Sequence, residues 1–270
     1  MRAAMALQSA LLCLAASATT ASATTATIAA SDARVDWAGR TKPTDGGSVS
    51  FDWLGVTSRV QVEGATWVSA TVSSSARMRG TRLKAYISDQ NFMMFPEVQF
   101  WVRGGGGNQT TDLFLGNNAG PRTVTLENIV DPQYGTGITT VHAFHTDGTF
   151  LALGNASVLG GATKRRIEFI GDSITAATNV VRPEGASGGC GDGGYQSDWS
   201  QTYSALLCHR FGASCSTIAV GGKCVMHECG GLQMPDYFPG LFYADAPKAT
   251  YVVQRMTLHY VLKKRFSIER

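Results

Sequence analysis

Apolar and polar residues alternate in short runs through the first half of the chain. These runs are Val49–Trp53, Val60–Glu63, Thr66–Val72, Leu83–Ile87, Val98–Arg103, Thr123–Leu126 and Ile138–Phe144. Turn-forming residues separate them, as in Asp45-Gly46-Gly47 and Asp147-Gly148. A period of two is typical of strands, and regular short strands divided by turns predict an antiparallel sandwich. We therefore expect an N-terminal all-β, jelly-roll-like sandwich over residues 24–160.

The pattern changes at Gly160-Gly161. We expect strands at Ile167–Ile170, Cys215–Val220 and Thr250–Gln254, and a helix at Thr202–Phe211 with Ser200 as its N-cap. Strand, helix, strand in this order predicts a parallel α/β unit. Ligands of such sheets bind beyond the carboxyl ends of the strands.

The N-terminus has the pattern of a secretory signal peptide. Arg2 is followed by the apolar stretch Met5–Ala18, which is too short to span a membrane. Ala21-Ser22-Ala23 fits a cleavage site, Ala16-Ser17-Ala18 is an alternative site, and a disordered Ala/Thr-rich tail is the alternative to a signal. We expect a signal peptide at 1–23 and a secreted, extracellular protein with no membrane partner.

The amino-acid composition limits the kinds of binding partner that we expect for this protein. The net charge is only +3 with 16% charged residues, which argues against nucleic acid or another polyanion. Cys13 leaves with the signal, and the other cysteines are Cys190, Cys208, Cys215, Cys224 and Cys229. In an oxidising compartment they predict one or two disulfides of undetermined pairing, and without a tight Cys-x-x-Cys pair we expect no metal and no cofactor. Sequons at Asn108 and Asn155 predict a glycoprotein.

The residues with candidate chemistry are Gly171-Asp172-Ser173, directly after the predicted strand at Ile167–Ile170. Gly171 permits a sharp turn, and the Asp172 carboxylate can accept local backbone N–H groups that fix it. Ser173 would then present its Oγ as a nucleophile, with its own N–H facing a developing oxyanion. An ordinary Asx-type turn is the alternative reading.

The block Arg166–Thr175 resembles the nucleophile block of the SGNH, or GDSL, hydrolases. The sandwich before it, the helix after it, Ile218–Lys223 and Met234–Tyr237 extend the resemblance to the carbohydrate esterase family 2 branch. That resemblance implies a flavodoxin-like α/β domain and serine-dependent removal of acetyl groups from plant polysaccharides such as xylan or mannan. It also implies that Ser173 is the nucleophile and that the backbone N–H groups of Ser173 and Gly222 form the oxyanion hole.

The sequence departs from this family in two places. Gly221 stands where the family has a serine, and Cys224 where it has a second glycine. After Val253 nothing matches the family's Gly-x-Asn-Asp or its Asp-x-x-His block, so we expect a C-terminally incomplete hydrolase with a basic, non-family tail at 255–270. His227 is the one histidine that we retain as a candidate base.

The expected organisation is a signal peptide at 1–23, the sandwich at 24–160, a partial SGNH domain at 161–254 and the tail. The expected function is that of a carbohydrate esterase, impaired in this chain because the catalytic histidine block is missing. The alternatives are a non-catalytic polysaccharide-binding protein that uses the sandwich, and a purely structural cell-surface protein.

Overall fold

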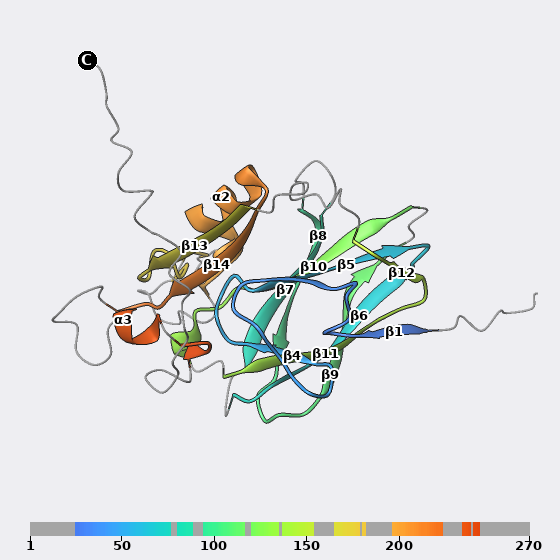
Figure 1. Ribbon diagram of the computed structural model, residues 1–270, viewed down its shortest axis with the longest axis horizontal. Helices are drawn as coiled ribbons and strands as arrows, with labels where there is room; N and C mark the ends of the chain where they lie inside the picture. Colours follow the sequence, from blue (N-terminus) through green and yellow to red (C-terminus); the bar gives the residue numbers. More distant parts are fainter. Residues whose placement is uncertain are drawn as a thin grey trace, which may run out of the picture.

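The computed structural model describes residues 25–76, 80–88, 94–116, 120–134, 137–153, 165–178, 180–181, 196–223, 234–238 and 240–243 (Figure 1). The predicted signal peptide, the strand at Thr250–Gln254, the basic tail and His227 lie outside these residues. So do Asn155, Cys190, Cys224, Cys229 and both expected boundaries of the partial SGNH domain, 161 and 254.

Two antiparallel sheets form the sandwich. One contains β3 (Lys42–Pro43), β4 (Val49–Phe51), β11 (Thr139–Thr146), β6 (Trp67–Ser74) and β9 (Gln109–Leu115) in that order, and β1 (Ala26–Ala29) also pairs with β11. The other contains β12 (Thr149–Leu151), β5 (Thr57–Glu63), β10 (Arg122–Asn128), β7 (Thr81–Ser88) and β8 (Met94–Val102), and β2 (Asp36–Ala38) also pairs with β5.

Alternation along the strands builds the core of the sandwich. Val60 and Val62 of β5 are almost fully buried, and so are Val68 and Val72 of β6 in the opposite sheet. Each predicted strand of this half is present. The strand β9 was missed, because its first residues, Gln109 to Asp112, are all polar and only Leu113 and Phe114 enter the core.

A two-stranded parallel sheet follows the sandwich. Gly171, at the end of β13 (Arg165–Gly171), is in register with Ala219, at the end of β14 (Ala213–Ala219). The helix α2 (Tyr203–Phe211) lies between these strands in the chain and packs mainly on β14. The predicted strand–helix–strand order is therefore present as a parallel unit.

The predicted N-cap of α2 was wrong. Thr202 is the N-cap, and its Oγ1 accepts the N–H of Ala205 at 3.3 Å. Ser200 lies two residues earlier, in the 3₁₀ helix η2 (Trp199–Gln201), where its Oγ donates to Asp198 Oδ1 at 2.6 Å. Both residues are good N-caps, so the local sequence could not separate them.

A disulfide joins Cys208 of α2 to Cys215 of β14, with 6.1 Å between the Cα atoms. The prediction of at least one disulfide is confirmed, and the structure supplies the pairing that spacing could not.

The parallel unit and the sandwich share a hydrophobic core. Ile218 of β14 and Val220, the residue after this strand, belong to the same buried cluster as the sandwich valines. Met234 and Tyr237 of α3 (Met234–Tyr237) belong to it as well. The Trp53 indole, 1% exposed, donates to the Leu241 carbonyl at 3.1 Å. Figure 1 shows β13, β14 and α2 gathered at one end of the sandwich, away from β1 and β12.

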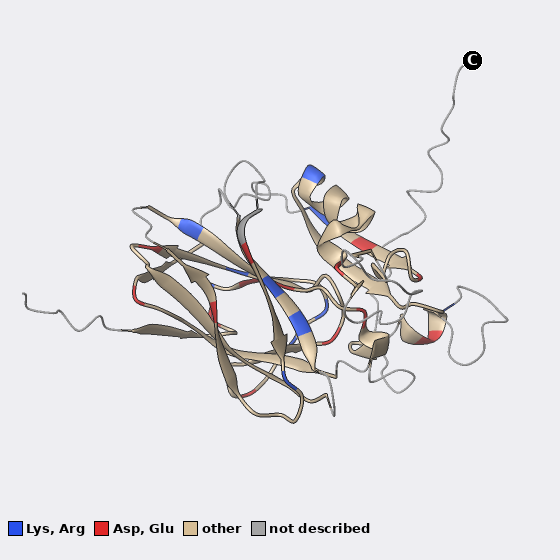
Figure 2. Ribbon diagram, turned by 180° about the vertical axis from the view of Figure 1, so that it is seen from behind, with Lys and Arg blue, Asp and Glu red and all other residues tan. Residues whose placement is uncertain are grey.

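The polar face of the second sheet is also covered. Lys84 of β7 and Glu127 of β10 point away from the sandwich core, yet they are 2% and 1% exposed. Lys84 Nζ donates to Ser200 Oγ at 2.7 Å and forms ion pairs with Glu97 and Asp198. Figure 2 shows charged residues of both signs spread over the two parts of the molecule.

Candidate functional site

The Ser173 turn begins where β13 ends. Asp172 Oδ1 accepts the Ile174 N–H at 3.1 Å, and the Asp172 carbonyl accepts the Ala176 N–H at 2.8 Å. Residues 173–178 form turns rather than a regular helix. Ser173 is partly exposed, and its Oγ forms no hydrogen bond with another described residue. The expected roles of Asp172 in the turn and of Ser173 as an accessible hydroxyl thus fit the local geometry.

Close packing explains the glycine before this turn. An ideal Cβ on Gly171 would lie 2.1 Å from Thr175 Oγ1, so no side chain fits there. Thr175 is buried, and its hydroxyl pairs with the Tyr203 hydroxyl at 2.9 Å. The Tyr203 ring in turn meets Phe169 of β13 edge-on, with 5.9 Å between centroids. The turn is therefore held against α2 by aromatic and hydroxyl contacts.

The loop that contains Gly221 and Gly222 begins at the same edge of the parallel sheet as the Ser173 turn. Because Gly171 and Ala219 are in register, the residues after each strand emerge side by side. The Val220 N–H donates to the Gly171 carbonyl at 3.4 Å, which joins the two loops. Gly222 is exposed, has a left-handed φ of 68° and faces open space.

Gly221 differs from Gly222 in both space and hydrogen bonding. Its N–H donates to Asp131 Oδ2 at 2.8 Å and is therefore occupied. An ideal Cβ on Gly221 would lie 2.1 Å from Gln133 Nε2, so a serine at this position would require the Gln133 side chain to move. Of the two glycines, Gly221 has its N–H bonded to Asp131, and Gly222 is the exposed one.

Asp131 was not anticipated as part of the site. It follows β10 of the sandwich, is 0% exposed and accepts hydrogen bonds from Gln133, Thr178 and Gly221. Burial raises the pKa of Asp131 to about 6, and these hydrogen bonds limit the rise. In the sequence, Asp131-Pro132-Gln133 has the composition of an ordinary turn, and no local signal connects it to Ser173.

Three histidines are among the described residues: His142, His145 and His209. His142 and His145 of β11 bridge hydroxyls of neighbouring strands: Ser48 and Ser73 for the first, Thr27 and Thr71 for the second. Both histidines therefore have a structural role in the sandwich. His209 lies in the last turn of α2, where burial first and then Lys84 and Arg59 lower its pKa. None of these three is bonded to Ser173.

Metal-binding clusters and membrane-spanning helices are the two other features to consider in the part of the chain that the structure describes. No cluster of three or more metal-ligating side chains occurs there. Within the same residues, no helix is long and apolar enough to cross a bilayer.

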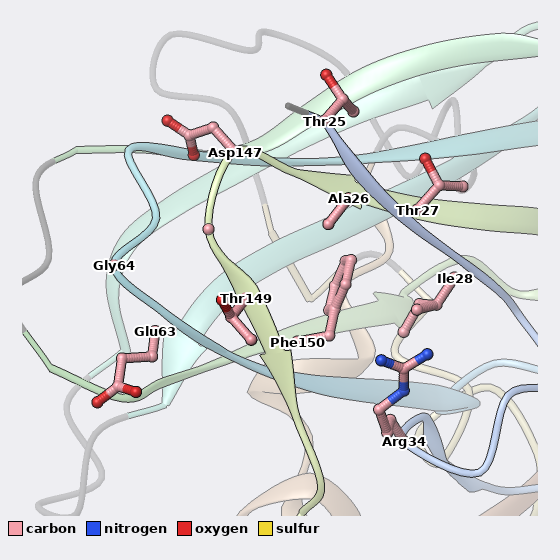
Figure 3. Close-up of a pocket in the computed structure, with 11 residues that line it drawn as sticks. Thr25, Ala26, Thr27, Ile28, Arg34, Glu63, Gly64, Asp147, Thr149 and Phe150 are labelled. Carbon is pink, nitrogen blue, oxygen red and sulfur yellow. The ribbon is translucent and has the colours of Figure 1, made fainter. Parts of the chain in front are cut away.

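A hollow of about 550 Å³ lies on the sandwich, at the end away from β13 and β14. Figure 3 shows it between β1 and the Asp147–Phe150 segment. Its lining is mostly polar and comprises Thr25, Ala26, Thr27, Ile28, Arg34, Glu63, Gly64, Asp147, Gly148, Thr149 and Phe150. Arg34 is paired with Asp32 at 2.8 Å, and Asp147 accepts the Thr66 N–H at 2.8 Å.

Solved structures share this architecture. A family two carbohydrate esterase from Cellvibrio japonicus aligns with a TM-score of 0.65 and 22% identity, over 81% of this chain and 60% of that protein. A family two carbohydrate esterase from Clostridium thermocellum in complex with cellohexaose has a TM-score of 0.61 and 21% identity, over 78% and 59%. An acetyl xylan esterase from the rumen bacterium Butyrivibrio proteoclasticus has a TM-score of 0.60 and 18% identity, over 74% and 50%.

All three are carbohydrate esterases. The predicted resemblance to family 2 carbohydrate esterases is therefore confirmed at the level of the fold, and this chain spans about three fifths of the length of the first two structures. No family model and no curated protein matches the sequence.

Proposed function

We propose that this protein is a secreted, carbohydrate-esterase-like hydrolase that removes acetyl groups from plant-type polysaccharides, with Ser173 as nucleophile. The observation that supports this most is the strand register. It brings the Ser173 turn and the Gly222 loop to one edge of a parallel sheet, where ligands of such sheets bind. The fold shared with carbohydrate esterases supports the reaction class.

The proposed chemistry is acyl transfer through the Ser173 hydroxyl. Its Oγ attacks the acetyl carbonyl while a base removes the proton, and the carbonyl oxygen gains negative charge. The backbone N–H groups of Ser173 and Gly222 would donate to that oxygen. The base returns the proton to the departing sugar hydroxyl, and water then releases acetate from the serine ester. We keep His227 as the candidate base.

The proposed substrate is a neutral, acetylated polysaccharide such as xylan or mannan. The low net charge of +3 suits a neutral polymer better than a polyanion. One structural neighbour is an acetyl xylan esterase, and another is in complex with cellohexaose. Secretion is supported by the signal-peptide pattern at 1–23 and agrees with the Cys208–Cys215 disulfide.

Ser173→Ala tests the proposal. Removing the attacking oxygen should lower acetate release from acetylated xylan to the uncatalysed background, whatever rate this chain reaches without the family's histidine block. Ser31→Ala is a matched control, since Ser31 is an exposed serine on the sandwich. Equal turnover by wild type and Ser173→Ala would rule out Ser173 as nucleophile.

A second candidate function is polysaccharide binding without catalysis. The polar hollow on the sandwich favours it, because Thr, Glu and Asp side chains can bind sugar hydroxyls. Thr149 lies on its lining and is exposed, so Thr149→Arg should fill the hollow. Retention on insoluble xylan that survives Ser173→Ala but is lost in Thr149→Arg would support this function.

A further inference from the structure

Asp131 enters the candidate site from a different part of the fold. Ser173 and Gly222 follow the two strands of the parallel unit, whereas Asp131 follows β10 of the sandwich and precedes the 3₁₀ helix η1 (Pro132–Tyr134). The side chain is 0% exposed. A fully buried carboxyl group with this many polar contacts requires an explanation, because burial of such a group is costly.

Its hydrogen bonds connect three segments. Asp131 Oδ2 accepts from Gly221 N–H at 2.8 Å, from Gln133 Nε2 at 2.9 Å and from Thr178 Oγ1 at 3.0 Å. Asp131 Oδ1 accepts the Gln133 N–H at 3.0 Å. Thr178 belongs to the Ser173 turn, since its own N–H donates to the Ser173 carbonyl at 3.0 Å. One carboxylate therefore holds both the nucleophile turn and the glycine loop.

This carboxylate also fixes the direction of the next amide. The bond to Asp131 fixes the position of the Gly221 N–H, and Gln133 and Thr178 fill the space around Gly221. The Gly222 N–H lies in the planar peptide unit that joins Gly221 to Gly222, so holding Gly221 in place restrains the direction of that N–H. An oxyanion donor stabilises charge only when it is held in place before the reaction.

We propose that Asp131 is a positioning residue that orients the Gly222 amide relative to Ser173 across the junction between the sandwich and the parallel unit. The proposal rests on the proposed esterase function, in which that amide stabilises the oxyanion. A residue that serves only to hold the fold together would affect stability without a selective effect on turnover.

The first measurement is steady-state hydrolysis of 4-nitrophenyl acetate by the full chain. Asp131→Asn places an amide NH₂ where either Oδ1 or Oδ2 now accepts, so at least one donor loses its acceptor. We expect kcat to fall by about 10- to 100-fold, short of the loss of a whole oxyanion donor, with KM within about twofold. Thr178→Val should lower kcat in the same direction, and Thr178→Ser, which keeps the hydroxyl, should restore it.

The second measurement is amide hydrogen exchange, which needs no turnover. In Asp131→Ala, which removes both acceptor oxygens, the Gly221 amide should exchange about tenfold faster or more, while the buried β7 amide of Ala85 keeps its protection. Loss of protection at Ala85 together with a rise in KM would mean a general structural role and overturn the proposal.

The two hypotheses fail in different ways. Equal activity of wild type and Ser173→Ala would reject the esterase function, and the exchange rate of Gly221 would still decide whether Asp131 holds the loop. Ser173-dependent activity with unchanged kcat in both Asp131→Asn and Thr178→Val would reject the positioning role alone. An unchanged Gly221 exchange rate in Asp131→Ala would reject it as well.

Discussion

Glu127 shows how a single side chain can depart from what its strand pattern suggests. It occupies a polar position of β10 that alternation assigns to solvent, yet it is 1% exposed. Neither of its carboxylate oxygens has a hydrogen-bond partner among the residues that the structure describes. Burial raises the pKa of Glu127 to about 8; Lys84 opposes this rise, while Asp198 and Glu97 add to it. Glu127 is therefore neutral in the folded protein at pH values where it is ionised in the unfolded chain.

This difference predicts a stability that falls with pH. Between about pH 5 and pH 8 the unfolded chain ionises Glu127 and the folded protein does not, so unfolding releases a proton and becomes easier as pH rises. The loss attributable to Glu127 over this window is about 4 kcal/mol at most. Glu127→Gln should remove it, so that urea unfolding at pH 5 and pH 8 gives more similar free energies than in wild type.

Glu63→Gln is the matched control. Glu63 lies on the neighbouring strand β5 and is exposed, so this variant should keep the wild-type pH dependence. A Glu127→Gln protein with the wild-type slope between pH 5 and pH 8 would show that Glu127 is already ionised in the fold.

At the scale of elements, α2 depends on covalent and aromatic contacts as well as on helix propensity. It is nine residues long, a length that is marginal for an isolated helix. Its hydrophobic contact with β14 includes the buried Ala205, while Leu206 is 60% exposed. The Cys208–Cys215 disulfide holds α2 to β14, which leads to the Gly222 loop.

Removal of this disulfide should destabilise the protein measurably. The bond closes a short loop, with a sequence separation of 7, which corresponds to about 2 to 3 kcal/mol in the chain-entropy account. The double variant Cys208→Ala, Cys215→Ala should therefore unfold at lower urea concentration and lower temperature. Dithiothreitol should shift the melting of wild type toward that of the double variant. If the double variant melts at the wild-type temperature, the bond contributes nothing to stability.

At the scale of the whole molecule, the sandwich and the parallel unit are joined by packing on several sides. Trp199 of η2 packs so closely on Gly55 that an ideal Cβ there would lie 2.6 Å from the indole. Arg40 of the sandwich donates to the carbonyls of Phe238 and Gly240 at 2.5 and 2.6 Å and pairs with Glu168 of β13 at 3.2 Å. The junction is therefore part of the core rather than a flexible connection.

This continuity predicts the behaviour of the separated sandwich. A 24–160 fragment keeps both antiparallel sheets but loses Ile218, Val220 and Met234 from the shared core. We expect it to melt at a lower temperature than the 24–270 chain and to bind a hydrophobic dye, because Trp53 and Leu54 become exposed to water.

Trp53→Ser in the fragment provides the control for this interpretation. It should reduce dye binding if that surface is responsible. A fragment with the melting temperature of the longer chain and no dye binding would show that the two parts fold independently.

Features that depend on neighbouring residues could be predicted from the sequence. Alternation of apolar and polar side chains predicted seven strands of the sandwich, because successive side chains of a strand point alternately into the core and away from it. Gly171, Asp172 and Ser173 predicted their own turn, because a glycine without a Cβ and a short acceptor side chain act within a few residues.

Features that depend on distant residues could be seen only in the folded protein. Gly221 and Gly222 look equivalent in the sequence, and they differ because Asp131, 90 residues earlier, accepts the N–H of the first. The alternation in β7 and β10 predicts that their polar face contacts solvent. This face is buried because η2 and its N-cap, more than a hundred residues after β7, contact Lys84 through Ser200 and Asp198. Such contacts form when two parts of the chain pack together, and no local pattern records them.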